Sequence, residues 1–379
     1  MLDDKTPAHP GDRDLRLDFL RGVTLLVVLI DHIEAQTSTS LIRSWTPRTI
    51  CLFDGADAFL FLSGFVFGRV FQRRLTDRGY VACQQRSIER ALRIYLTYLA
   101  TVSILVGIGL CLQDYSPILA NRLNLSEGAG RCMSWSVLMC YQPFGTSILP
   151  MYALILPFAP PLLFWQLRSR ITAWILPFSL YIAAQVNPGL QLPRFPFGQW
   201  HFNPFAWQFL FFFGLSAGTG GWGQLFQSRI RSILLFGSLV TLVIGVLIQK
   251  ECLAAITGFD GIGQTMKAYA TEWSNKTRYG PLRLIHFAAF VLILSTILPG
   301  AQANIWQKPV FAPIIKCGQT SLIVYSAGVI LTFLSIPVFQ ILGESPGVVL
   351  MVEFDCCVLS VVFAFLASSQ RLRKPTPRI

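Results

Sequence analysis

Ten long, continuous apolar runs recur along the chain and set the strongest limit on its fold. An α-helix needs about 20 apolar residues to cross the hydrocarbon core of a membrane. The runs do not alternate between apolar and polar residues, as the strands of a membrane β-barrel do. The sequence therefore predicts an all-α, polytopic membrane helical bundle with about ten transmembrane helices. The expected spans are residues 17–33, 55–71, 91–112, 148–166, 171–187, 204–220, 232–249, 282–300, 317–341 and 346–368.

The composition excludes an ordinary soluble protein. Of the 379 residues, 53% are hydrophobic and 13% are charged, against about 25% charged in soluble domains. The formal net charge is +12, and about two thirds of the Lys and Arg residues fall on one side of the expected bundle, as the positive-inside rule requires of cytoplasmic loops. We therefore expect both termini to be cytoplasmic. The basic charge follows from topology, so the expected partner is the lipid bilayer and not nucleic acid.

The expected loops are too short to hold a soluble domain, and the longest cytoplasmic one covers residues 72–90. We expect a cytoplasmic tail over residues 1–12, one integral membrane domain over 13–370 and a basic cytoplasmic tail over 371–379. Any chemistry must therefore be carried by polar residues of the bundle. The nine cysteines include no C-x-x-C pair, so no metal site is expected.

The first expected span carries ionisable residues near both ends, which is costly in a membrane and typical of functional sites. Arg21 lies near the inner end, and Asp31 and His32 lie at the outer end. Arg21 and His32 are eleven residues apart, which is about 16 Å along a helix, so both can face one bundle interior. Two simpler interpretations stay open: Arg21 as a topology anchor, and Asp31 with His32 as a marker of the water boundary.

The second expected span adds polar residues near the outer face and in mid-membrane. Asp57 lies at the start of this span, where its carboxylate can orient His32 or cap its own helix. Ser63 precedes Gly64 in the middle of the span. This pair indicates close packing of two helices, or room for a narrow ligand between them.

A basic stripe of Arg86, Arg90 and Arg93 opens the third expected span at its inner end. Guanidinium groups match phosphates, which favours an anionic cytosolic ligand, although positive-inside charge explains the stripe as well. The expected outer half holds further polar residues, namely His201, His286, Glu353 and Asp355. Together these residues predict a basic inner mouth for an anionic donor and a polar outer cavity for proton transfer.

Three segments resemble the integral membrane acyltransferase type 3 superfamily. They are the Arg-x10-His pair Arg21 and His32, the FLFLSGF segment 59–65, and the Arg-x-x-Arg pair Arg90 and Arg93. The stretches RDLRLDFLRG, GADAFLFLSGF, FNPFAWQFLFFFG and PLRLIHF are similar to the OpgC branch, which is named for succinyl modification of osmoregulated periplasmic glucans. The likeness covers most of the chain.

The resemblance implies an acyltransferase of the bacterial cytoplasmic (inner) membrane. The donor would be cytosolic acyl-CoA, and the acceptor a hydroxyl of a periplasmic glucan or another extracytoplasmic glycan. Arg21, Arg90 and Arg93 would hold the CoA phosphates, and the pantetheine arm would pass Ser63. Acyl-CoA enters as a substrate, and no permanently bound cofactor is expected.

The resemblance also implies that His32 is the general base, with Asp31 or Asp57 as its orienting carboxylate. It leaves open whether the acyl group is succinyl or acetyl, whether transfer is direct or passes through an acyl-enzyme, and which oligomer forms. The alternative function is a transporter or flippase for an anionic or glycan substrate, because charges inside a bundle fit that role too.

Overall fold

The computed structural model describes residues 13–220, 230–250, 252 and 260–373. The regular elements in these ranges are helices, which confirms the all-α class. The helices that contain the apolar runs are α1 (Leu15–Glu34), α3 (Gly55–Leu112), α6 (Ile148–Ile155), α7 (Ala159–Arg168), α8 (Ile175–Val186), α9 (Pro204–Gly218), α10 (Ile230–Gln249), α13 (Pro281–Ile297), α15 (Ser321–Leu342) and α16 (Pro346–Arg373). The shorter helices are α2 (Pro47–Ile50), α4 (Pro117–Arg122), α5 (Ala129–Val137), α12 (Asp260–Trp273) and α14 (Ala312–Gln319).

Five segments are long and apolar enough to cross a membrane, which supports a multi-pass membrane protein. They are Gly55–Leu112, Ile148–Arg168, Ile230–Gln249, Ser321–Leu342 and Pro346–Ser369. Thr172–Val186 and Pro281–Ile297 are shorter apolar helices. The count of about ten spans and the cytoplasmic location of both termini stay predictions.

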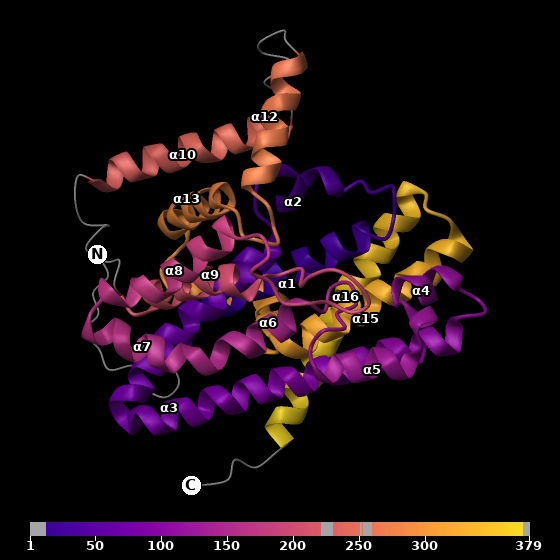
Figure 1. Cartoon of the computed structure of the whole chain (residues 1–379), viewed down its shortest axis with the longest axis horizontal. Coiled ribbons are helices and arrows are strands. Elements are labelled where there is room, and N and C mark those ends of the chain that lie inside the picture. The colour runs from indigo at the N-terminus through magenta and orange to yellow at the C-terminus, as the bar shows by residue number, and fades with distance from the viewer. Residues whose placement is uncertain (1–12, 221–229, 251, 253–259, 374–379) are drawn as a thin grey trace.

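The α3 helix joins two of the expected spans and bends at Gly79, where φ is 77° and ψ is 176°. The Cys83 sulfur lies 3.7 Å from the Phe71 carbonyl oxygen, so the arms before and after the bend fold back beside one another (Figure 1). The expectation of a loop over residues 72–90 is therefore wrong. Hydropathy alone misses this helix because a helix that leaves the apolar layer becomes polar without losing its backbone hydrogen bonds.

The first arm of α3 packs against α9 through glycines on both helices. A Cβ atom added at Gly64 would lie 2.0 Å from the Phe211 carbonyl oxygen, and one added at Gly218 would lie 2.1 Å from the Phe65 carbonyl oxygen. Gly68 and Gly214 make equally close approaches. Each helix thus presents two glycines four residues apart, the pattern that lets membrane helices approach closely.

The α1 helix lies inside the bundle, next to α3, α14, α15 and α16 (Figure 1). Gly22 lies so near α14 that an added Cβ atom would lie 1.9 Å from the Ile314 carbonyl oxygen. Leu25 and Leu29, one and two turns along, are each 3% exposed. Because protein surrounds α1, polar side chains along it meet other helices, and this arrangement creates the site described next.

Candidate active site

One face of α1 connects the two ends of the candidate site. Eleven residues make three helical turns plus about 20°, so Arg21 and His32 project from the same face. Leu25 and Leu29 lie between them on that face. The helix therefore holds a guanidinium and an imidazole roughly 16 Å apart along a single stripe.

The His32 imidazole lies at the C-terminal end of this stripe, which is the end expected to face outward, beside the loop that follows α5. Its ring packs edge-on against Phe144, with 5.1 Å between the ring centroids. A Cβ atom at Gly145 would lie 3.2 Å from His32 Nδ1, and the Tyr325 hydroxyl donates a hydrogen bond to the Gly145 carbonyl oxygen. Tyr325 thus fixes the loop beside His32. Neither ring nitrogen of His32 has a hydrogen-bond partner among the described residues.

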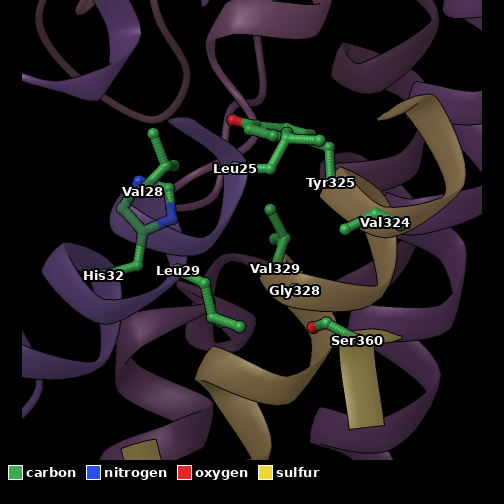
Figure 2. A pocket seen from close by; sticks show the side chains of 9 residues that line it. All are labelled: Leu25, Val28, Leu29, His32, Val324, Tyr325, Gly328, Val329 and Ser360. Atoms are coloured by element: carbon green, nitrogen blue, oxygen red, sulfur yellow. The ribbon is translucent and has the colours of Figure 1, made fainter. Parts of the chain in front are cut away.

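A small pocket opens from His32 toward the inner end of α1 (Figure 2). The empty space within its bounds, part of which is open solvent, is about 230 Å³. Ser360 of α16 lies across the pocket from His32, and its buried hydroxyl has no hydrogen-bond partner in the described part of the chain. The lining residues are Leu25, Val28, Leu29, His32, Val324, Tyr325, Gly328, Val329 and Ser360. The pocket is therefore apolar apart from His32, the Tyr325 phenol and the Ser360 hydroxyl.

A buried cluster of two carboxylates and two cations flanks the outer end of the site. Arg283 donates from Nε to Asp57 Oδ1 at 2.9 Å and from Nη2 to Asp57 Oδ2 at 2.5 Å. Arg283 Nη2 also lies 3.0 Å from Asp54 Oδ2, and Lys276 Nζ lies 2.6 Å from the same oxygen. The two carboxylates are thus neutralised by two cations, as burial of charge requires.

Asp57 has two roles. It caps α3, which was one of its expected roles, and it also belongs to this ion-pair cluster, which was not expected. It accepts the backbone N–H of Asp54 at 2.9 Å, and Asp54 accepts that of Ala56 at 2.9 Å, which forms a capping box. Both carboxylate oxygens of Asp57 bind Arg283. Of the cluster, Lys276 and Asp54 lie near enough to His32 to act on it electrostatically.

Asp31 is buried, with 5% of its surface exposed, but it lies on another face of α1. Neighbouring residues of an α-helix project about 100° apart, so the carboxylate does not share the His32 stripe. It interacts with Thr46 and Arg48 of the segment that includes α2. One carboxylate oxygen lacks a hydrogen-bond partner among the described residues.

At the inner end, the structure brings Arg21 and Arg90 together. Arg21 lies within electrostatic reach of Arg90 and Tyr152, and the Arg90 guanidinium carbon lies 5.5 Å from the centroid of the Tyr152 ring. Neither arginine forms an ion pair in the described ranges, although the Asp18 carboxylate, which Arg13 binds at 2.5 Å, also acts electrostatically on Arg21. Two guanidinium groups without an ion-pair partner at the same end of the site suit an anion.

The other expected site residues lie away from the face of α1 that carries Arg21 and His32. Arg93 is exposed, one turn beyond Arg90 on α3. Arg86 pairs with Glu89 at 2.9 Å. Ser63 is 1% exposed and does not line the pocket, and its neighbour Gly64 packs against α9, so close helix packing explains this pair.

The polar residues of the outer half are dispersed. His286 is fully buried, with its ring centroid 5.6 Å from that of Phe53. Glu353 shares the Ser40 hydroxyl with Glu34, at 3.2 Å and 2.9 Å respectively. Asp355 is exposed. The expectation that these three residues gather in one outer cavity with His32 is therefore wrong, whereas His201 does lie within electrostatic reach of His32.

Several residues of the site were not predicted as such. Arg283 stands in an apolar helix and Tyr152 in an apolar run, so each offered a signal that an intramembrane polar group is functional. Lys276 lies in a polar loop, and Ser360 is one small polar residue in a long apolar helix. Nothing in the sequence distinguished these two from neighbours of the same type.

The helical bundle, with polar residues such as Arg21 and His32 inside it, defines a multi-pass membrane protein with an internal site. The chain belongs to the OpgC family: the sequence model of this family, described as OpgC protein, matches residues 13–372. Membership indicates a membrane transferase of the acyltransferase type. Neither a curated protein nor a solved structure matches the chain.

Proposed function

We propose that the protein moves an acyl group, succinyl or acetyl, from cytosolic acyl-CoA to a hydroxyl of a periplasmic glucan or another extracytoplasmic glycan. The observation that carries this proposal is the single face of α1, which presents Arg21 near one end and His32 near the other. A pocket lined by Leu25, Leu29 and His32, among others, lies along this face. A donor held at the inner end thus extends toward a base at the outer end, and CoA need not cross the inner membrane.

Arg21 and Arg90 would hold the phosphates of CoA. Neither arginine forms an ion pair within the described part of the chain, which supports this role, because an anion would relieve the electrostatic repulsion between the two guanidinium groups. Arg93, exposed one turn away, would attract the donor and not enclose it. The pantetheine arm would run along the Arg21–His32 face of α1, and this route replaces the one past Ser63.

His32 would act as the general base. Its nitrogen takes the proton of the acceptor hydroxyl as the oxygen attacks the thioester carbonyl carbon. The carbon–sulfur bond breaks, the ester forms, and the proton passes from His32 to the CoA thiolate. Asp57 would act on His32 indirectly, as a positioning residue, because Arg283 binds both Asp57 and Asp54. Asp31 would modulate the electric field at His32 from the neighbouring face of α1.

Purified full-length protein in proteoliposomes tests the proposal. The assay supplies labelled acetyl-CoA or succinyl-CoA on one side and a periplasmic glucan extract on the other, and mass spectrometry detects acylated glycan. Ester-linked label that depends on the protein supports transfer. Movement of unmodified glycan or intact acyl-CoA without ester formation would support the transporter alternative and refute the proposal.

A further inference from the structure

We propose that Phe144 is the platform on which a pyranose ring of the acceptor glycan stacks beside His32, with Lys276 and His201 as the polar edge of the same subsite. This inference rests on the proposed acyl transfer and specifies how its acceptor binds. It is carried by the exposure of the Phe144 ring, by the rigidity of the loop that holds this ring, and by the partly exposed polar groups around the same imidazole.

Phe144 is an exposed ring in a loop whose neighbouring side chains are buried. Pro143 and Thr146 are buried, whereas Phe144 is 38% exposed. The same ring packs against His32, with 5.1 Å between the ring centroids. An apolar ring that stays accessible beside the expected base offers a contact to a molecule that approaches this base.

The turn that carries Phe144 is rigid. The backbone N–H and the hydroxyl of Thr146 both donate to the Pro143 carbonyl oxygen, at 3.0 Å and 2.8 Å. Gly145 has a φ of 80°, which a type II turn requires at its third position, and its carbonyl oxygen accepts from the Tyr325 hydroxyl. Phe144 therefore occupies the second position of a turn that is fixed both internally and by α15.

The segment before this turn is also fixed by its surroundings. The Tyr98 hydroxyl of α3 donates to the Tyr141 carbonyl oxygen at 2.5 Å, and Arg194 Nη2 donates to the Gln142 carbonyl oxygen at 3.0 Å. A side chain that is in place before its ligand arrives loses little conformational entropy on binding. The loop is thus preorganised to present a ring.

Two partly exposed polar side chains lie around the same imidazole. Lys276 Nζ lies 5.3 Å from the centroid of the buried Phe202 ring, and the His201 ring packs edge-on against it at 4.9 Å. Both residues act electrostatically on His32. The Lys276 side chain is 33% exposed and binds Asp54 at 2.6 Å, which occupies one of the three N–H donors of an ammonium group. The remaining donors can reach a ligand.

This combination of groups suits a sugar. One face of a pyranose consists of C–H groups, which complement the negative face of an aromatic ring, and its edge carries hydroxyls that accept from ammonium and imidazole donors. A lipid alcohol would use the ring and leave the polar edge without a partner. A small acyclic polyol would use the polar edge alone.

The dependence of the transfer rate on glucan concentration tests the subsite in the proteoliposome assay. Phe144→Leu should raise the KM for the glucan by about five- to tenfold, because leucine is apolar but has no ring face. The KM for acyl-CoA should stay within about twofold of wild type. Phe144→Tyr keeps the ring and should stay within about threefold of wild type in glucan KM.

Tyr115→Leu is the matched control, because Tyr115 is an exposed ring on the same expected side of the membrane, whereas the ring contact of His32 is with Phe144. An unchanged glucan KM in folded Phe144→Leu would overturn the inference. So would a fall in kcat with both KM values unchanged, which would make Phe144 a positioning residue for His32. No ester formation by the wild-type protein would instead refute the proposed function.

Lys276→Gln tests the polar edge. It should raise the glucan KM by at least about fivefold through loss of a charged donor, with the KM for acyl-CoA unchanged. An unchanged glucan KM in a folded Lys276→Gln variant would contradict this part of the subsite.

A competitor tests the class of ligand independently of kinetics on the natural acceptor. Methyl glucoside, a single pyranose, should inhibit transfer to the glucan by the wild-type protein, and glycerol at the same hydroxyl concentration should not. Phe144→Leu should weaken this inhibition by about five- to tenfold. Equal inhibition by methyl glucoside and glycerol would contradict recognition of the sugar ring.

Discussion

Replacing Arg283 by glutamine should destabilise the protein strongly. Arg283 is 6% exposed and Asp57 is fully buried, and two hydrogen bonds of 2.9 Å and 2.5 Å join them. Removal of one partner of a buried ion pair leaves an uncompensated charge and costs about 3–5 kcal/mol. With an unfolding entropy of about 2.1 cal/mol/K per residue, this cost lowers the melting temperature of 379 residues by at least roughly 4 °C.

Thermal unfolding of purified protein in detergent, followed by tryptophan fluorescence, measures the effect. Arg278→Gln is the matched control, because this neighbouring arginine forms no side-chain ion pair among the described residues. The double variant Asp57→Asn with Arg283→Gln should recover part of the loss, since it buries no unpaired charge. A melting temperature for Arg283→Gln equal to that of Arg278→Gln would refute the buried ion pair.

Three further predictions concern packing, donor binding and topology. Gly64→Leu should abolish recovery of folded protein on size-exclusion chromatography, because even a Cβ atom lies 2.0 Å from the α9 backbone, and normal recovery would contradict the glycine interface. Arg90→Ala should weaken CoA binding in titration calorimetry by roughly ten- to hundredfold and Arg93→Ala by much less, whereas equal effects would argue against the site formed with Arg21. An impermeant thiol reagent on intact spheroplasts should label Tyr115→Cys and spare Arg170→Cys in a background without native cysteines, and the reverse labelling would overturn cytoplasmic termini.

The apolar runs predicted the positions of the main helices well, because burial in lipid demands continuous apolar sequence. They did not predict the bend at Gly79, since a polar helix beyond the membrane and a loop have similar hydropathy. The glycine pairs of α3 and α9 illustrate a further limit. Ser63–Gly64 suggested either packing or a ligand path, and only the position of α9 decides for packing.

Helical periodicity predicts which site residues share a face of one helix, but it does not predict which residues of different helices meet. Arg21 and His32 share a face because of their spacing alone. The partner of Asp57 is Arg283, 226 residues away, and no pattern in a single sequence fixes such a pairing. The same holds for the placement of Ser360 across the pocket from His32.

The role of His32 as the general base is the central claim, and the rate of acyl transfer by His32→Gln tests it most directly. Glutamine keeps much of the size and hydrogen-bonding capacity of histidine but has no basic nitrogen. With equal amounts of folded protein in proteoliposomes, the account predicts a loss of about a hundredfold or more in transfer rate, CoA binding unchanged at the distant inner site, and a far smaller effect of His201→Gln. Retention of most of the wild-type rate by His32→Gln would contradict the account.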